Sequence, residues 1–269
     1  MSSERAYPLA ASIAGIGFWS HGLPDWEAAS AFVTTGALPA DAAARPSPQL
    51  LAPNERRRAP ETVAVALHVA LAACTAAGRD PALLPSVFAS THGDLAITDY
   101  MCATLVDAPR TISPTKFHNS VHNAAAGYWT IGAGALAPST AISAYDASFA
   151  QGLLEALVQI ATGSEAVLLV AYDGTGTGPL GRISPSSGLL GGALLLVRDP
   201  TPGTTRLSLR LGDAASSRDA VAEGPLGKLI AGNAMAPMLP VFEALALREA
   251  GVSLAAGTGR VIHLEFDHA

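Results

Sequence analysis

The chain has 269 residues, of which 49% are hydrophobic and 14% are charged, and its formal net charge is −6. This length allows one large domain or two small ones, with enough residues for a sizeable core. The negative charge gives no electrostatic reason to expect nucleic acid or an anionic membrane as a partner. The low content of charged residues favours an obligate protein partner, although the many alanines explain part of it.

The sequence has no segment typical of a signal peptide or a membrane span. The N-terminal MSSERAYPLAASI lacks an apolar run after its charges, and the longest uncharged runs fall short of the roughly 18–20 apolar residues that a membrane helix needs. Cys74 and Cys102 do not have metal-site spacing; a disulfide between them stays open, but two reduced thiols are favoured. We therefore expect a soluble cytoplasmic protein without a metal or cofactor.

Buried strands and helices are predicted to alternate over the first 200 residues. The helix at 60–77 begins with Pro60 and Glu61 and carries no charge from Thr62 onward, so we expect it to be buried on most sides. We interpret His68, in its middle, as a hydrogen-bonded core or rim histidine. The predicted elements are strand 9–17, helix 26–33, a loop over 34–54, helix 60–77, strand 86–90, a helix from about residue 95, a strand before residue 146, helix 147–162, strand 165–172 and strand 188–198.

This order, β-α-β-α-β-α-β-β, predicts a layered α/β domain around a central sheet. The paired glycines of strand 188–198 indicate a close backbone approach or a bulge. A Pro/Gly joint at 199–203 precedes a shorter tail, with a strand at 205–212, a Gly/Ser/Asp loop, a helix at 237–250 and a strand at 260–267. We expect two domains, residues 1–199 and a reduced βαβ unit, residues 200–269, packed on the first.

Three short motifs each have a plain and a sharper interpretation. The basic run 56–58 is interpreted as a solvated lead into a helix, or as a docking point for an acidic carrier protein. The GTGTG stretch at 174–178 lacks the Lys-Ser/Thr of a phosphate-binding loop, so it is interpreted as a flexible loop. Residues 91–94, THGD, follow a strand where α/β sheets bind ligands, although a capping turn explains them equally well.

The most specific motif is ISPTKFHNSVHNAAAGYWTIGAGALAPSTAISAYD, residues 112–146. Its ISP, Asn, Ala-Gly, Thr-Ile and Pro-Ser positions resemble, without a gap, the segment of β-ketoacyl-ACP synthases that leads to the catalytic cysteine. Asp146 occupies the cysteine position. The string FHNSVHNAAAGYW is similar to the short chain length factors of aryl polyene pigment clusters, which are ketosynthase-like subunits of type II polyketide systems. The likeness covers about residues 9–199.

This resemblance implies a thiolase-like (ketosynthase) fold with a complete N-terminal half and a truncated C-terminal half. It also implies a catalytically silent chain, because a carboxylate is a weak nucleophile towards a thioester. The His-Gly-Thr-Gly-Thr stretch that would supply one of the two catalytic histidines does not occur after residue 150, where only His263 and His268 remain. We expect Asp146 to cap the following helix and to favour its dipole.

Subunits of this fold join their sheets edge to edge, so the resemblance implies an active ketosynthase as the partner in a heterodimer, with acyl carrier protein engaged indirectly. A loop from one subunit faces the acyl tunnel of the other, and Phe117 is the first candidate for a stop that limits chain length. The expected tunnel residues are Thr115, Lys116, Phe117 and His118 on the loop and Val121 on the helix behind it. The expected interface residues are His122, then Asn123 on that same helix, and the strand residues Ala141, Ile142, Ser143, Ala144 and Tyr145.

Two other functions stay open. One is an independent acyl-thioester hydrolase that uses Asp146 or a histidine as a base. The other is a homodimeric acyl-binding scaffold without a ketosynthase partner. His118 and His122 lie four residues apart and would share one face of a helix, but without a third ligand they are interpreted as polar interface contacts instead of a metal or catalytic pair.

Overall fold

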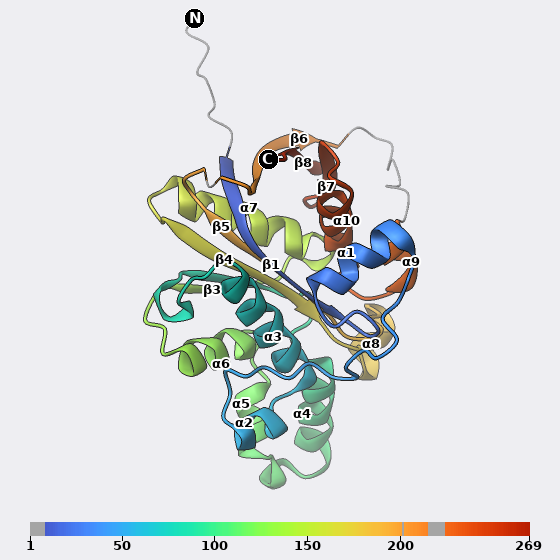
Figure 1. The fold of residues 1–269 in the computed structure, drawn as a ribbon. Helices are drawn as coiled ribbons and strands as arrows, with labels where there is room; N and C mark the ends of the chain where they lie inside the picture. Colours follow the sequence, from blue (N-terminus) through green and yellow to red (C-terminus); the bar gives the residue numbers. More distant parts are fainter. Residues whose placement is uncertain (1–8, 201, 215–223) are drawn as a thin grey trace, which may run out of the picture.

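One eight-stranded sheet runs through the computed structural model, which describes residues 9–200, 202–214 and 224–269 (Figure 1). The strand order is β3-β2-β4-β5-β1-β6-β8-β7. Strands β3, β2 and β4 pair in parallel, and every other pairing is antiparallel. The strands are β1 (Leu9–Ser20), β2 (Ser86–Ala89), β3 (Ser139–Ile142), β4 (Ala166–Asp173), β5 (Leu190–Val197), β6 (Thr205–Asp213), β7 (Gly251–Ala255) and β8 (Arg260–Asp267).

Helices cover both faces of this sheet. Helices α3 and α6 pack on one face, and α1, α7 and α10 pack on the other (Figure 1). The helices are α1 (Trp26–Thr35), α2 (Pro53–Arg58), α3 (Glu61–Ala76), α4 (Leu95–Asp107), α5 (Pro114–Asn119), α6 (Ala124–Ala133), α7 (Ser148–Ala161), α8 (Gly178–Ile183), α9 (Pro225–Leu229) and α10 (Leu239–Leu247). Short 3-10 turns lie at Pro81–Leu83, Pro109–Thr111, Tyr145–Ala147 and Ala236–Met238.

The central strand β4 shows why the apolar runs are continuous. Its residues Val167 and Leu169 join the core cluster under α7, whereas Leu168 and Val170 join the cluster under α3. Because both faces are covered, neither set of alternating side chains is exposed to water. The predicted order of the strands from β1 to β5 is confirmed, whereas the short helices α2, α5 and α8 were not predicted.

Glycines let two helices lie directly on the sheet. A Cβ atom at Gly17 of β1 would lie 2.1 Å from the carbonyl oxygen of Val69 in α3. A Cβ atom at Gly192 of β5 would lie 2.6 Å from the Phe242 ring of α10, on the opposite face. The close approach predicted for 188–198 is thus present, and the bulge lies instead in β1, where the register shifts between Ile13 and Gly15.

The C-terminal tail extends the same sheet, and part of the prediction for it is wrong. Strand β6 pairs with β1, so the tail continues the sheet beyond the strand at which the chain begins. The helix predicted at 237–250 ends earlier, because Arg248 adopts a left-handed conformation (φ 54°) that stops α10. The chain then forms β7, which pairs antiparallel with β8, so the tail is βαββ instead of βαβ. Most of the loop predicted after residue 212 lies outside the described residues.

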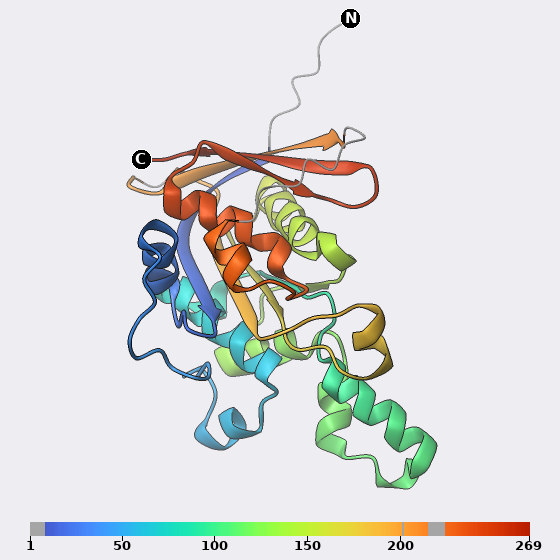
Figure 2. The same ribbon diagram turned by 90° about the vertical axis from the view of Figure 1, so that its right-hand side faces the viewer.

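Helices α4 and α5 form an arm that projects away from the sheet, opposite the tail (Figure 2). They contact each other, and α4 also contacts α8. The arm exposes apolar side chains, among them Leu105, Val106 and Phe117. Such a surface on a projecting element is typical of a protein interface.

Two further expectations are tested by the described residues. Cys74 is buried and Cys102 exposed, and both are free, so they form no disulfide with each other. Burial raises the pKa of the Cys74 thiol to about 12, so this thiol stays protonated at neutral pH. No helix in the described parts of the chain combines the length and the apolarity that crossing a bilayer requires.

Candidate functional site

A strained turn presents Asp146 between β3 and α7. Its strain lies at Tyr145, whose φ of 55° falls in the left-handed region that non-glycine residues rarely adopt. The carbonyl oxygen of Tyr145 accepts hydrogen bonds from the Thr91 hydroxyl at 3.0 Å and the Ser148 hydroxyl at 2.6 Å. Ser148 Oγ also accepts from the Ala144 N–H at 3.0 Å. These contacts from the loop after β2 and from α7 hold the turn in a conformation that its own sequence does not favour.

Asp146 itself is exposed and caps no helix. It lies in the 3-10 turn Tyr145–Ala147, and the residue at the N-cap of α7 is Ala147, which makes no side-chain capping bond. Within the described residues no helix N–H donates to the Asp146 carboxylate, so the expectation that it caps α7 is wrong. The extra 3-10 turn is the reason, because it places Asp146 one residue too early to reach the free N–H groups of α7.

A buried carboxylate holds the loop after β2 against this turn. Asp173, at the end of β4, is fully buried and accepts from the Ser90 hydroxyl at 2.7 Å and the N–H groups of Thr91 at 2.8 Å and His92 at 3.1 Å. Burial raises the pKa of Asp173, and these three donors oppose the rise. The sequence analysis did not single out Asp173, and its only signal was an acidic residue ending a continuous apolar strand.

The two central histidines do not form a pair. His118 lies on α5 with its ring against Tyr128, and His122 lies in the turn before α6, so they share no helix face. The Nε2 atom of His122 lies 2.9 Å from the Ser90 carbonyl oxygen, which fixes the turn to the end of β2. The described residues contain no group of three or more side chains able to hold a metal ion.

The two C-terminal histidines lie at the other end of the sheet. His263 lies on β8, and His268 follows the end of that strand. Both rings also have local partners: His263 Nδ1 lies 2.9 Å from Ser253 Oγ, and His268 Nδ1 lies 3.1 Å from Thr205 Oγ1. Both rings are thus engaged by groups of the tail itself.

The segment expected to face a tunnel is helical. Thr115, Lys116, Phe117 and His118 belong to α5, not to a loop, because Ser113 caps this short helix and Pro114 begins it. Val121 and Asn123 lie in the turn before α6, not on a helix. Phe117 is 63% exposed on the arm. All six residues thus lie along the arm and the turn that follows it. The loop expected for the first four and the helix expected for the last two are wrong.

Strand β3 forms one end of the sheet and carries an apolar surface. It spans Ser139–Ile142, so residues 143–145, expected on the interface strand, form the turn instead. Beside this strand α6 and its C-terminal turn expose Ile131 and Leu136, the latter 99% exposed. Tyr145 is 61% exposed. A groove of about 440 Å³ lies between β3 and α7, lined by Ile142, Ser143, Ala144, Gln151, Leu154, Glu155 and Val158.

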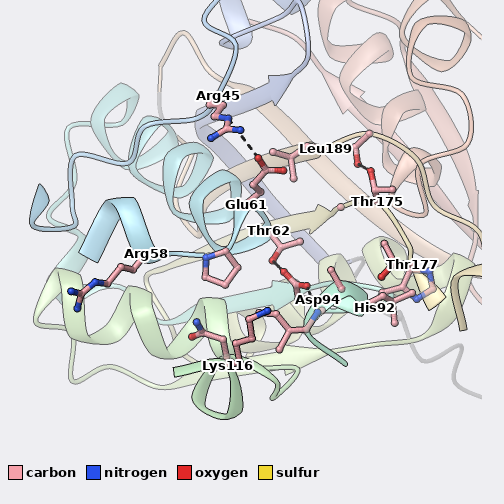
Figure 3. Close-up of a pocket in the computed structure, with 18 of the residues that line it drawn as sticks. Arg45, Arg58, Glu61, Thr62, His92, Asp94, Lys116, Thr175, Thr177 and Leu189 are labelled. Atoms are coloured by element: carbon pink, nitrogen blue, oxygen red, sulfur yellow. Dashed lines mark hydrogen bonds and ion pairs between the residues drawn. The ribbon is translucent and has the colours of Figure 1, made fainter. Parts of the chain in front are cut away.

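A larger pocket of about 840 Å³ lies on the other side of the β2 loop, near the N-terminal ends of α3 and α4 (Figure 3). The Thr62 hydroxyl donates to Asp94 at 2.9 Å, and Asp94 also caps α4 through the Ile97 N–H at 3.0 Å. Arg45 and Glu61 form an ion pair at 3.7 Å on its rim. The GTGTG stretch contributes to the wall through Gly174, Thr175 and Thr177. Asp146 is not among the lining residues.

Solved structures share this fold over nearly the whole chain. A chain of the complex between the ketosynthase ApeO and its chain length factor ApeC from Xenorhabdus doucetiae is 23% identical, with a TM-score of 0.73, and the match covers 95% of this chain and 99% of that one. A chain of the ishigamide ketosynthase/chain length factor is 15% identical, with a TM-score of 0.76 and coverages of 96% and 99%. These likenesses establish the thiolase-like ketosynthase fold.

A third solved structure, a type II polyketide acyl carrier protein in complex with its hexaketide-bound ketosynthase, matches at 13% identity with a TM-score of 0.74, over 98% of this chain and 100% of that one. No curated protein sequence matches the chain. The family model described as "Beta-ketoacyl synthase, N-terminal domain" matches residues 26–216, which include Asp146 and every strand from β2 to β6. The chain therefore belongs to the family of proteins with a β-ketoacyl synthase N-terminal domain.

Proposed function

We propose that the chain is a non-catalytic chain length factor that pairs in the cytoplasm with an active β-ketoacyl-ACP synthase and shapes its acyl tunnel in polyketide or aryl polyene biosynthesis. The observation that carries this proposal is Asp146, an exposed carboxylate on the turn where the family has its nucleophile. The turn keeps its strained backbone and its supporting hydrogen bonds, whereas both histidines of the tail are engaged by a serine and a threonine of the tail itself. An intact scaffold without the reacting groups supports a role in shape and assembly.

Pairing is supported by the end of the sheet at β3. The β3 strand has a neighbour on one side only, and exposed apolar side chains lie beside it. An unprotected edge of this kind is a template for another strand. Two of the similar solved structures are described as ketosynthases together with their chain length factors, and a third contains an acyl carrier protein. We extend the ketosynthase partner to this chain, with the acyl carrier protein bound through that partner.

The tunnel role is assigned to the exposed stretch of the arm. Phe117, Val121 and their neighbours project from an element that reaches beyond the sheet (Figure 2). In a pair joined at β3, we place this stretch against the partner's acyl tunnel. A bulky side chain at the tunnel end then disfavours chains above one length while leaving shorter ones unaffected.

The test is a tagged purification from the native host, with mass spectrometry of the proteins recovered at near-equal amounts. A ketosynthase with an intact cysteine and histidine pair is the expected partner. Recovery of a homodimer alone would contradict the proposal and favour the acyl-binding scaffold. The hydrolase alternative predicts that the purified chain turns over acyl thioesters and that Asp146→Ala abolishes the turnover. We expect no turnover by the wild type or by Asp146→Ala.

A further inference from the structure

The groove between the edge strand β3 and α7 carries one charge on an apolar wall. Its volume is about 440 Å³, and Ile142 of β3 with Leu154 and Val158 of α7 supply the apolar surface. Val158 is 39% exposed. Glu155 is the only charged residue among the described residues that line this groove. The proposed pairing at β3 covers this face, so its carboxylate has to be matched there.

Glu155 has no cationic partner among the described residues. Its carboxylate accepts a hydrogen bond from Gln159 Nε2 at 2.8 Å and takes part in no ion pair with them. The same Gln159 nitrogen lies 3.4 Å from Thr140 Oγ1, which ties the carboxylate to the middle of β3. Glu155 is already half-buried, and a neutral amide offsets only part of the cost of covering a carboxylate completely.

Pairing at β3 places this carboxylate close to a symmetry axis. When two edge strands pair antiparallel around a two-fold axis, the axis runs perpendicular to the sheets, and equivalent faces of the two sheets lie on the same side. Helix α7 then lies beside the corresponding helix of the other subunit. The groove of each subunit receives side chains of the other subunit's helix.

Two copies of this chain would set Glu155 against Glu155, because a two-fold pair brings the same patch together from both sides. Residues 139–161, which form β3, the turn and α7, contain no lysine, arginine or histidine. Arg260 follows the tail loop that Gln151 contacts through the Ala256 carbonyl oxygen, and it is paired with Asp213. Such a pair would enclose two carboxylates without a cation, which opposes its formation.

We infer that Glu155 selects the partner: the groove takes the corresponding helix of a different subunit, one that sets an arginine or lysine against Glu155, and it rejects a second copy of this chain. That the different subunit is the ketosynthase rests on the proposed function. The apolar wall supplies contact area to either partner, and Glu155 supplies the choice between them. An ion pair enclosed in this interface is screened little by salt.

The first test uses the full chain alone, in two differently tagged copies that are expressed together. Wild type and Glu155→Lys should bind each other at least about ten-fold more tightly than either binds itself, since the new ammonium group faces Glu155. Glu155→Gln, which removes the repulsion without adding a charge, should bind itself at least about ten-fold more tightly than the wild type does. Analytical ultracentrifugation of the single and mixed proteins measures these dissociation constants.

Glu27→Lys is the matched control. It makes the same change on α1, which packs on β1 and α10 instead of β3, so this variant should bind the wild type no better than the wild type binds itself. A wild-type homodimer as tight as the mixed pair, or equal effects of Glu27→Lys and Glu155→Lys, would overturn the inference.

The second test measures binding to the co-purified ketosynthase. Glu155→Gln should weaken this complex by about ten-fold and Glu155→Lys by more, whereas Glu27→Lys should stay within about two-fold. A ketosynthase that binds Glu155→Lys as tightly as the wild type would contradict the role of Glu155 and leave the proposed function intact. Recovery of no ketosynthase would contradict the proposed function, and the mixed-copy test would still decide whether Glu155 selects the partner.

Discussion

At the scale of single residues, Phe117 separates a role in chain length from a role in assembly. It is large, exposed and on the arm that we place at the partner's tunnel. Phe117→Ala removes most of its bulk, so we expect the complex to make products longer by one or more two-carbon units. Ile131→Ala, beside β3, should weaken pairing without changing product length. Mass spectrometry of products made by the reconstituted complex measures both, and an unchanged length distribution in Phe117→Ala would remove this residue from the tunnel.

Asp173 makes the stability of the folded chain depend on pH. Because burial raises its folded-state pKa above the ordinary value of about 4, the folded protein keeps a proton that the unfolded chain releases. The resulting stability is fully present below about pH 4 and is lost as the pH rises through the folded pKa. The quantity to follow is the free energy of unfolding of the wild type minus that of Asp173→Asn. We expect this difference to fall by about 1 kcal/mol or more as the pH rises from about 4 through the folded-state pKa of Asp173.

Urea unfolding at several pH values from 4 to 7 measures this difference. Taking the difference between the two proteins matters because burial also raises the pKa of Glu243, which accepts from the N–H groups of Leu226 and Gly227. That second carboxyl contributes equally to both curves. A difference that grows with pH would mean that the three donors to Asp173 outweigh its burial.

At the scale of elements, the edge strand β3 allows pairing to be tested without unfolding the chain. The Ser86 N–H donates to the carbonyl oxygen of Pro138, and the Ser90 N–H donates to that of Ile142. Alternate residues of β3 therefore direct their backbone N–H and C=O groups towards β2. The intervening Ala141 therefore points its N–H away from β2. Ala141→Pro deletes only that outward donor, and we expect it to weaken the ketosynthase complex by at least about ten-fold. Ala141→Val keeps the donor and serves as the control; equal co-purification of both variants would exclude edge-to-edge pairing through β3.

The contact between α3 and β1 predicts where the chain is least tolerant of added atoms. At Gly17 a new Cβ would meet the helix backbone at Val69, which cannot rotate away. Gly17→Ala should therefore cost about 3 kcal/mol of stability. In α6, a Cβ at Gly127 meets nothing within 4 Å, so Gly127→Ala should be neutral or stabilise by up to about 1 kcal/mol. Chemical denaturation distinguishes them, and similar midpoints would show that α3 can shift on the sheet.

At the scale of the whole molecule, the assembly should be apolar in character. The side chains exposed beside β3 and on the arm include the large apolar Leu105, Val106, Phe117, Ile131 and Leu136, with Asp107 and Lys116 as exposed charges on the arm. We expect the dissociation constant of the complex to change by less than about three-fold between 0.1 and 1 M salt, since screening acts on charges and not on apolar contacts. Light scattering on the co-purified complex measures this. A complex that separates at high salt would instead assign the pairing to the arginines of α2 and α5's lysine.

The limits of the sequence prediction are clearest where contacts distant in sequence decide the structure. Continuous apolar runs were enough to predict β4 and β5, because a strand that is buried on both faces carries apolar side chains at successive positions. Strand β7 of the tail was not predicted. It is short and half-exposed, and its pairing with β8 stabilises it. The strained turn before Asp146 was not predicted, because residues 143–145 were expected on the strand, and its hydrogen bond to Thr91 joins residues 54 positions apart in the chain. The pocket at α3 had one local signal, the THGD stretch after β2, of which His92, Gly93 and Asp94 line the wall, and the rest of its wall comes from distant parts of the chain.

The place of β1 in the sheet has a consequence for synthesis on the ribosome. This strand leaves the ribosome before the other strands of the sheet, yet both of its neighbours, β5 and β6, begin at residue 190 or later. For about two thirds of translation the nascent chain therefore carries an apolar, glycine-containing strand with no sheet to join. Long-range pairing of this kind is slow and leaves strand edges open to aggregation. A host that makes this protein must protect this strand until β5 has emerged.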